Sequence, residues 1–261
     1  MIAILLMATL SLRAQKLHVF ESENLHCNDS VWVFSPAKQA KVKNLPTAFV
    51  LHGASGCYND WNRHMDLQKL ADETGFRIIT PDGFRYGWYI DNADKNEMQW
   101  MTFFEKELYP TMAQEYGLDP EKTFITGLSM GGHGAMTTFL SHKDWFRSGG
   151  SMSGVLDIRG RESIGKMLGA ASIEDHILYD HSAVGMVQNL KGTDKFCIVT
   201  CGTEDSLVGH SRAFEQVCKE NGVHCIAMYS PGAHNWKYWP FILEYHLDWF
   251  SRIMNGEPLG F

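Results

Sequence analysis

Gly127-Leu128-Ser129-Met130-Gly131-Gly132 carries the strongest structural signal in the sequence. It follows the short apolar run 123–126 and precedes a plausible helix. A serine between two glycines, each two residues away, is typical of a tight strand-to-helix turn, because the glycines let the turn close without side-chain collisions. The pattern therefore predicts that Ser129 is an exposed nucleophile at the end of a strand.

The rest of the chain alternates short apolar runs with amphipathic stretches. The other short runs, each followed by a turn signal, are 48–51, 76–80, 196–200 and 224–229, and the helical patterns cover 61–74, 97–116, 211–220 and 240–254. Pro110 is expected to kink or split the second of these helices. Apolar strands that alternate with helices favour a mainly parallel sheet with helices on both faces. We therefore predict one α/β domain, with its functional residues just after the strands.

An acid and a base follow the fourth and fifth apolar runs. Asp205 comes after the run 196–200, and His234 comes after the run 224–229. The order Ser, acid, His is the one found on α/β sheets of this kind. His234 would take the proton from Ser129, and Asp205 would orient the imidazole and stabilise its charged form.

Other residues compete for these roles. Glu204 is the neighbour that could replace Asp205, and Asp157 follows another short apolar run, 152–156. We favour Asp205 because it follows the later strand, the one nearest in sequence to His234. His210 is the main alternative base, but its short separation from Asp205 makes a three-way geometry awkward. His133 is expected to pack in the helix after Ser129.

Acyl transfer also needs two N–H donors for the oxyanion. The first is expected to be the backbone N–H of Met130, directly after the nucleophile, and the second to be that of Ala54 in the glycine-rich segment 51–56. That segment is not a phosphate loop, because no G-K-[ST] follows it. Trp88, Tyr89 and Trp236 are candidate substrate-binding residues, with packing as the alternative reading for these aromatic side chains.

Composition excludes other classes of function. The formal net charge is −7 and the isoelectric point is near 5.9, so a nucleic-acid partner is not expected. The six cysteines form no CxxC pair and no zinc-like cluster with histidines, so no metal is expected. The chemistry described above needs only side chains and water, so no cofactor is expected either.

The amino terminus is predicted to be an export signal. The apolar run 2–12 is about half the length of a membrane span, and small residues follow it. We expect a signal peptide over 1–15, a periplasmic or secreted location, no membrane span and a single catalytic domain over 16–261. The alternative reading is a buried first strand or an apolar tail.

Taken together, these segments resemble the α/β-hydrolase superfamily. More narrowly, they are similar to the “putative-esterase” family, which includes tributyrin esterases, S-formylglutathione hydrolases, feruloyl and acetylxylan esterases, and mycolyltransferases. The matching segments are VLHGASG from Val50, GWYID from Gly87, GLSMGGHGA from Gly127, SGVLD from Ser153, CGTED from Cys201 and PGAHNWKYW from Pro231.

The resemblance implies an α/β-hydrolase fold with Ser129, Asp205 and His234 as the triad and Ala54 and Met130 as oxyanion donors. It implies a serine carboxylesterase that acts on short-chain acyl esters, small or polymeric. Acetyl and feruloyl esters of plant polysaccharide are candidate substrates. The alternatives are an S-formylglutathione hydrolase-like thioesterase, an acyltransferase, and a non-catalytic carbohydrate-binding homologue.

Overall fold

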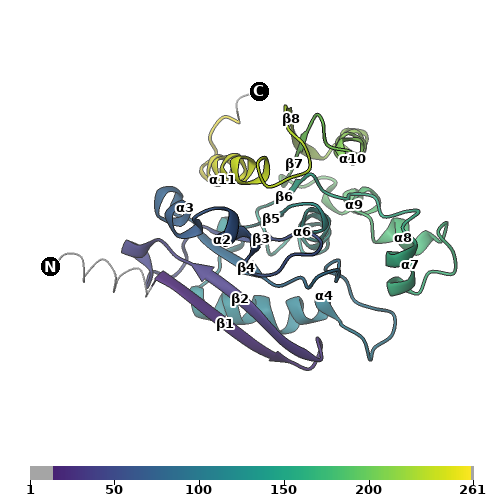
Figure 1. The fold of residues 1–261 in the computed structure, drawn as a ribbon. Helices are drawn as coiled ribbons and strands as arrows, with labels where there is room; N and C mark the ends of the chain where they lie inside the picture. The colour runs from purple at the N-terminus through teal and green to yellow at the C-terminus, as the bar shows by residue number, and fades with distance from the viewer. Residues whose placement is uncertain (1–13, 260–261) are drawn as a thin grey trace.

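A single eight-stranded sheet forms the centre of the computed structural model, which describes residues 14–259 (Figure 1). Its strands lie in the order β1-β2-β4-β3-β5-β6-β7-β8. They are β1 (Gln15–Ser22), β2 (Cys27–Phe34), β3 (Thr47–Leu51), β4 (Arg77–Pro81), β5 (Thr123–Gly127), β6 (Ser148–Met152), β7 (Phe196–Gly202) and β8 (His224–Ser230). Only the β1–β2 and β2–β4 pairs are antiparallel. The predicted mainly parallel α/β sheet is confirmed.

Helices cover both faces of this sheet (Figure 1). They are α2 (Asp60–His64), α3 (Leu67–Thr74), α4 (Trp100–Phe103), α5 (Tyr109–Tyr116), α6 (Met130–Ser141), α7 (Glu162–Leu168), α8 (His176–Asp180), α9 (Ala183–Met186), α10 (Val208–Asn221) and α11 (Trp239–Asn255). Shorter helical turns are η1 (Ala37–Gln39), the π turn η2 (Phe104–Leu108), η3 (Pro120–Lys122) and η4 (Val187–Leu190).

Strand β3 shows how the core is divided into two layers. Phe49 and Leu51 pack with α4, α5, α6 and α10 in one apolar cluster. Ala48 and Val50 pack with α2, α3 and α11 in the other. Successive side chains of a strand point to opposite faces, so a run that is apolar throughout must be covered on both sides. This is why the short apolar runs, rather than alternating patterns, marked the central strands.

Two predicted helices differ from the structure. The stretch 61–74 contains two helices, because the Asp66 side chain accepts a hydrogen bond from the Lys69 N–H at 2.9 Å and starts α3 afresh. The stretch 97–116 becomes helical at Trp100, and Pro110 does not break it. The π turn η2 lies directly before Tyr109, and its wider turn makes room for the Pro110 ring, which has no N–H to donate to the preceding turn.

The run 152–156 is not a strand, since β6 ends at Met152. The strand is instead formed by residues 148–152, of which the first four are serine or glycine, and their small size has a packing reason. A Cβ on Gly149 would collide with the Phe139 ring, and one on Gly150 would collide with the His246 ring. Strand β6 is therefore built of residues small enough to let α6 and α11 approach the sheet.

The expected export signal lies almost wholly outside the described residues. Of the predicted segment 1–15, the structure describes Ala14, whose carbonyl accepts a hydrogen bond from the Ser35 N–H at 2.8 Å, and Gln15, the first residue of β1. Within residues 14–259, no helix has both the length and the apolar composition needed to cross a bilayer.

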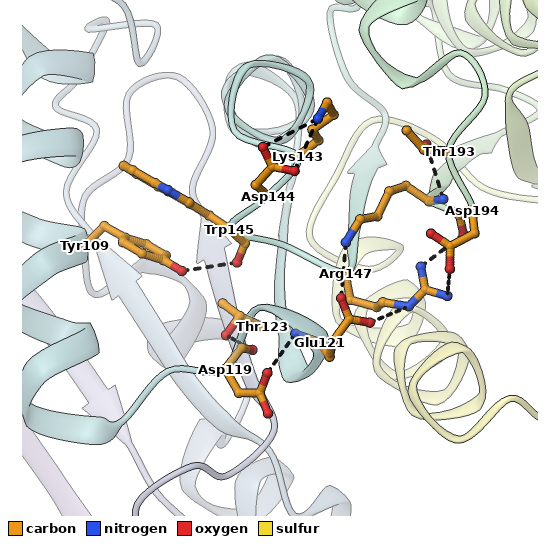
Figure 2. Close-up of polar contacts among 11 residues, drawn as sticks. Tyr109, Asp119, Glu121, Thr123, Lys143, Asp144, Trp145, Arg147, Thr193 and Asp194 are labelled. Carbon is orange, nitrogen blue, oxygen red and sulfur yellow. Dashed lines mark hydrogen bonds and ion pairs between the residues drawn. The ribbon is translucent and has the colours of Figure 1, made fainter.

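A polar network joins the segments that enter β5, β6 and β7 (Figure 2). The Arg147 guanidinium lies 3.4 Å from a Glu121 carboxylate oxygen and 3.1 Å from a carboxylate oxygen of Asp194. Beside it, the Tyr109 hydroxyl donates to the Trp145 carbonyl at 3.1 Å. These residues precede their strands, so the network lies at the edge of the sheet opposite the carboxyl ends. We assign it a structural role.

Candidate active site

Ser129 occupies the turn between β5 and α6. Its backbone angles are φ 53° and ψ −114°, a conformation that few residues with a side chain adopt. Its N–H donates to the Met152 carbonyl at 2.9 Å. A Cβ on Gly127 would press against the Gly131 carbonyl, and one on Gly131 would press against the backbone of residues 51–52. The glycines are therefore required by close backbone contacts at this turn.

The three predicted triad residues form a series in which His234 lies within hydrogen-bonding distance of the other two. His234 Nε2 is 3.0 Å from Ser129 Oγ, and His234 Nδ1 is 2.8 Å from Asp205 Oδ2. Each residue follows the carboxyl end of its strand, β5, β7 or β8. With a proton on Nδ1 donated to Asp205, the Nε2 lone pair is free to accept the serine proton. This arrangement can activate the hydroxyl as a nucleophile.

The competing acids and bases lie elsewhere. Glu204 is exposed, whereas the Asp205 side chain is fully buried, and its second oxygen accepts a hydrogen bond from the Leu207 N–H at 2.8 Å. Asp157 pairs with Arg159, and the hydrogen bonds from Arg159 outweigh the effect of burial and lower the pKa of Asp157. His210 accepts from the Asp157 N–H at 3.3 Å.

The Ala54 segment lies beside the nucleophile. Met130 is the first residue of α6, where helix N–H groups have no partner within the helix. Among residues 14–259 no recorded hydrogen bond has the Ala54 N–H as its donor. Both N–H groups are therefore available to an oxyanion.

His52 and Tyr89 support this segment, a role that the sequence did not reveal. His52 Nε2 accepts the Gly83 N–H at 2.8 Å, so its Nδ1 carries the proton and donates to the Gly53 carbonyl at 2.8 Å. The Tyr89 hydroxyl donates to the His52 carbonyl, also at 2.8 Å. Three hydrogen bonds thus fix the backbone directly before Ala54.

Ser129 opens into a cavity of about 350 Å³. Its walls are formed by Gly53, Ala54, Asp60, Leu128, Ser129, His234, Asn235, Trp236 and Trp239. Of the three aromatic residues predicted to bind substrate, only Trp236 is among them. Tyr89 is fully buried, and Trp88 packs edge-on against His133, with 5.8 Å between ring centroids. Neither side chain is therefore among those that line this cavity.

Within residues 14–259, no three His, Cys, Asp or Glu side chains form a group that could hold a metal ion. The six cysteines are all unpaired, and Cys197 and Cys201 are fully buried.

The family model and the similar proteins all point to one family of esterases. The family model described as “Putative esterase” matches residues 22–249. An acetyl esterase of Caldicellulosiruptor saccharolyticus is 26% identical over 241 residues, which cover 84% of this chain and 88% of that protein. An S-formylglutathione hydrolase of Arabidopsis thaliana is 22% identical over 265 residues, which cover 90% of this chain and 91% of that protein.

Solved structures share the fold. A ferulic acid esterase has a TM-score of 0.78 at 25% identity, over 92% of this chain and 98% of that chain. MPT51 of Mycobacterium tuberculosis has a TM-score of 0.77 at 20% identity, over the same shares, and at that identity it shows the fold alone. By the match over residues 22–249, the chain belongs to the “Putative esterase” family and is a carboxylic ester hydrolase with an α/β-hydrolase fold.

Proposed function

We propose that this chain is a serine esterase that hydrolyses short-chain acyl esters through an acyl-enzyme intermediate. The observation that carries the proposal is the hydrogen-bonded series Ser129–His234–Asp205 beside two free backbone N–H groups. Acetyl and feruloyl esters of plant polysaccharide are the proposed natural substrates, in line with the acetyl esterase and ferulic acid esterase relatives.

The reaction then has two halves. Ser129 Oγ attacks the ester carbonyl carbon while His234 Nε2 takes the hydroxyl proton, and the Ala54 and Met130 N–H groups stabilise the oxyanion. When the intermediate collapses, the C–O bond to the alcohol breaks and His234 returns the proton to the leaving oxygen. Water, deprotonated by His234, attacks the acyl-enzyme in the same way and releases the acid and free Ser129.

Removal of the nucleophile tests this proposal. Ser129→Ala is expected to lower kcat for 4-nitrophenyl acetate by at least about a thousandfold, since no other residue can form the acyl-enzyme. The matched control is Ser172→Ala, which changes an exposed serine far along the chain from the triad and should keep the wild-type rate. Wild-type turnover by Ser129→Ala would show that the proposed mechanism is wrong.

Thioester hydrolysis is the second candidate function. It is favoured by the S-formylglutathione hydrolase relative, which is similar over 90% of this chain. The same triad would serve either substrate, because only the leaving group differs. The choice therefore depends on the groups that surround the leaving group.

A further inference from the structure

The cavity beside Ser129 contains a carboxylate that the triad does not use. Asp60 is the first residue of α2, and its side chain is 17% exposed. Asp60 Oδ1 accepts a hydrogen bond from Arg63 Nη1 at 3.2 Å and faces Cys57 Sγ at 3.8 Å. Asp60 Oδ2 lies close to Gly56, and among the hydrogen bonds of residues 14–259 none involves it. Asp60 thus brings to the cavity wall a carboxylate with one oxygen that has no hydrogen-bond partner.

The packing of α2 places Asp60 on the leaving-group side of the site. His234 must reach the leaving oxygen in order to protonate it, so the alcohol lies beside the segment 234–236. Within that segment, the Trp236 ring stacks on His64 at 4.0 Å with an angle of 11° between the ring planes, and it meets Trp61 edge-on at 5.2 Å. Because His64 and Trp61 belong to α2, this helix is packed against the wall that the alcohol must touch.

The groups on this wall suit a neutral, hydroxyl-rich alcohol. A carboxylate oxygen accepts hydrogen bonds from hydroxyl groups, and such charge-assisted bonds are stronger than neutral ones. Asn235 Oδ1 is used by the Lys237 N–H at 3.0 Å, while its amide N–H groups can donate to a sugar oxygen. Trp236 and Trp239 add apolar surface.

An anionic leaving group would be disfavoured on this wall. Its negative charge would be repelled by Asp60, and unpaired like charges are a common way to reject the wrong ligand. Arg63 offsets part of this repulsion, but its side chain is 59% exposed, so solvent screens it more strongly than the Asp60 carboxylate. We propose that Asp60 is a specificity residue that selects esters of neutral polyols over esters or thioesters with anionic leaving groups, glutathione among them. This inference rests on the proposed esterase function.

The test uses three acetyl esters that differ only in the leaving group. Phenyl acetate is the neutral reference, 4-acetoxybenzoate adds a negative charge to the same ring, and an acetylated methyl xyloside supplies hydroxyl groups. In Asp60→Asn we expect kcat/KM for 4-acetoxybenzoate to rise about fivefold relative to phenyl acetate. The value for the xyloside ester should fall about fivefold relative to the same reference, because a charge-assisted hydrogen bond is lost. Such opposite changes cannot come from a general loss of folded enzyme.

Two further variants complete the design. Arg63→Gln leaves Asp60 without its counter-charge and should lower the 4-acetoxybenzoate to phenyl acetate ratio, which provides an independent measurement even if Asp60→Asn folds poorly. Glu73→Gln removes an exposed carboxylate of α3 outside the cavity and should leave both ratios unchanged. Unchanged ratios in Asp60→Asn or in Arg63→Gln would overturn the role of Asp60 while the esterase function stands. If the wild-type protein hydrolysed none of the three esters, the proposed function itself would fail.

Discussion

Ser129 is held in its unfavourable backbone conformation by neighbours from two other strands. A residue in such a region typically costs about 1–3 kcal/mol and persists only where the surrounding structure enforces it. The next residue after β6, Ser153, also has a positive φ of 51°, and its N–H donates to the Thr200 carbonyl at 2.7 Å. Trp239 donates to Ser153 Oγ at 3.2 Å and packs edge-on against the His234 ring. Ser129 and His234, the proposed nucleophile and base, are thus fixed by one set of contacts.

Tyr89 is expected to act through the backbone of the oxyanion segment. Tyr89→Phe removes the hydrogen bond to the His52 carbonyl and leaves that buried acceptor unpaired, which should lower the free energy of unfolding by about 1–2 kcal/mol. Because His52 leads into Ala54, we also expect kcat for an acetyl ester to fall severalfold with little change in KM. Urea denaturation and steady-state kinetics measure the two effects.

Tyr245→Phe is the control for this experiment, since Tyr245 is 40% exposed on α11. It should change the free energy of unfolding by less than about 0.5 kcal/mol. If Tyr89→Phe altered only KM, and only for aromatic esters, Tyr89 would have to contact the substrate, as its position in the sequence first suggested.

The difference between Tyr89 and the three proposed triad residues shows which placements in the fold can be predicted from sequence. Ser129, Asp205 and His234 each follow a short apolar run, and the carboxyl ends of parallel strands meet at one edge of a sheet. Tyr89 instead reaches His52 through a loop that turns back on itself, with positive φ angles at Phe84, Trp88 and Tyr89. Turn residues such as Gly83 and Gly87 mark the loop, but none of the three residues with positive φ is a glycine, so the sequence does not show where the chain reverses.

At the scale of elements, α6 lies so close to β3 that a side chain at its second residue would collide with the backbone. Gly131 is its second residue, and a Cβ there would lie 2.5 Å from the His52 carbonyl oxygen. Gly131→Ala must push α6 away from β3, so we expect a loss of at least about 2 kcal/mol in stability and a large loss of esterase activity. Thermal unfolding and hydrolysis of 4-nitrophenyl acetate test both.

Gly209 provides a matched control, because it is the second residue of another helix, α10, and open space surrounds the position of its missing Cβ. Gly209→Ala should leave activity unchanged and raise stability by up to about 1 kcal/mol, since alanine favours a helix over glycine. Equal effects of the two substitutions would mean that close packing of α6 is not what requires Gly131.

The two antiparallel strands, β1 at the edge of the sheet and β2 beside it, could not be predicted as readily as the central ones. Strand β1 reads QKLHVFES and faces solvent on one side, while His18 and Phe20 contact Tyr116 and Phe103 on the other. Its apolar residues are therefore few, and the pattern resembles a loop. The central strands are buried on both faces, and only such strands produce continuous apolar runs.

Across the whole molecule, the pH dependence of stability should be governed by buried groups that stay neutral: histidines with a lowered pKa and an aspartic acid with a raised pKa. His246 of α11 bridges β5 and β7, with Thr126 Oγ1 at 2.8 Å from Nδ1 and Thr200 Oγ1 at 2.9 Å from Nε2. Burial lowers the pKa of His246 to about 3 and that of His133 to about 4. On β2, burial and then the nearby Asp82 carboxylate raise the pKa of Asp29 to about 8.

These shifts predict a maximum of stability near pH 6.5. At these three groups, between about pH 4 and 6.5, the unfolded chain binds two more protons at His246 and His133, while the folded chain binds one more at Asp29. The net difference of one proton makes stability fall by about 1.4 kcal/mol per unit as the pH decreases. Above pH 6.5 Asp29 is the one of the three that still contributes, so stability falls by a similar amount per unit up to about pH 8.

Two substitutions separate the acid limb of this stability–pH profile, below pH 6.5, from its alkaline limb, above pH 6.5. Asp29→Asn keeps the shape of the side chain but cannot titrate. Stability should therefore become level between pH 6.5 and 8 and should fall more steeply as the pH decreases below 6.5. His246→Gln retains an amide that can reach both threonines, and it should flatten the acid limb while leaving the alkaline limb unchanged. Urea denaturation at pH 5, 6.5 and 8 measures all four slopes. Since the two variants must change opposite limbs, a parallel shift of the whole profile in both would refute the assignment of either limb to its buried group.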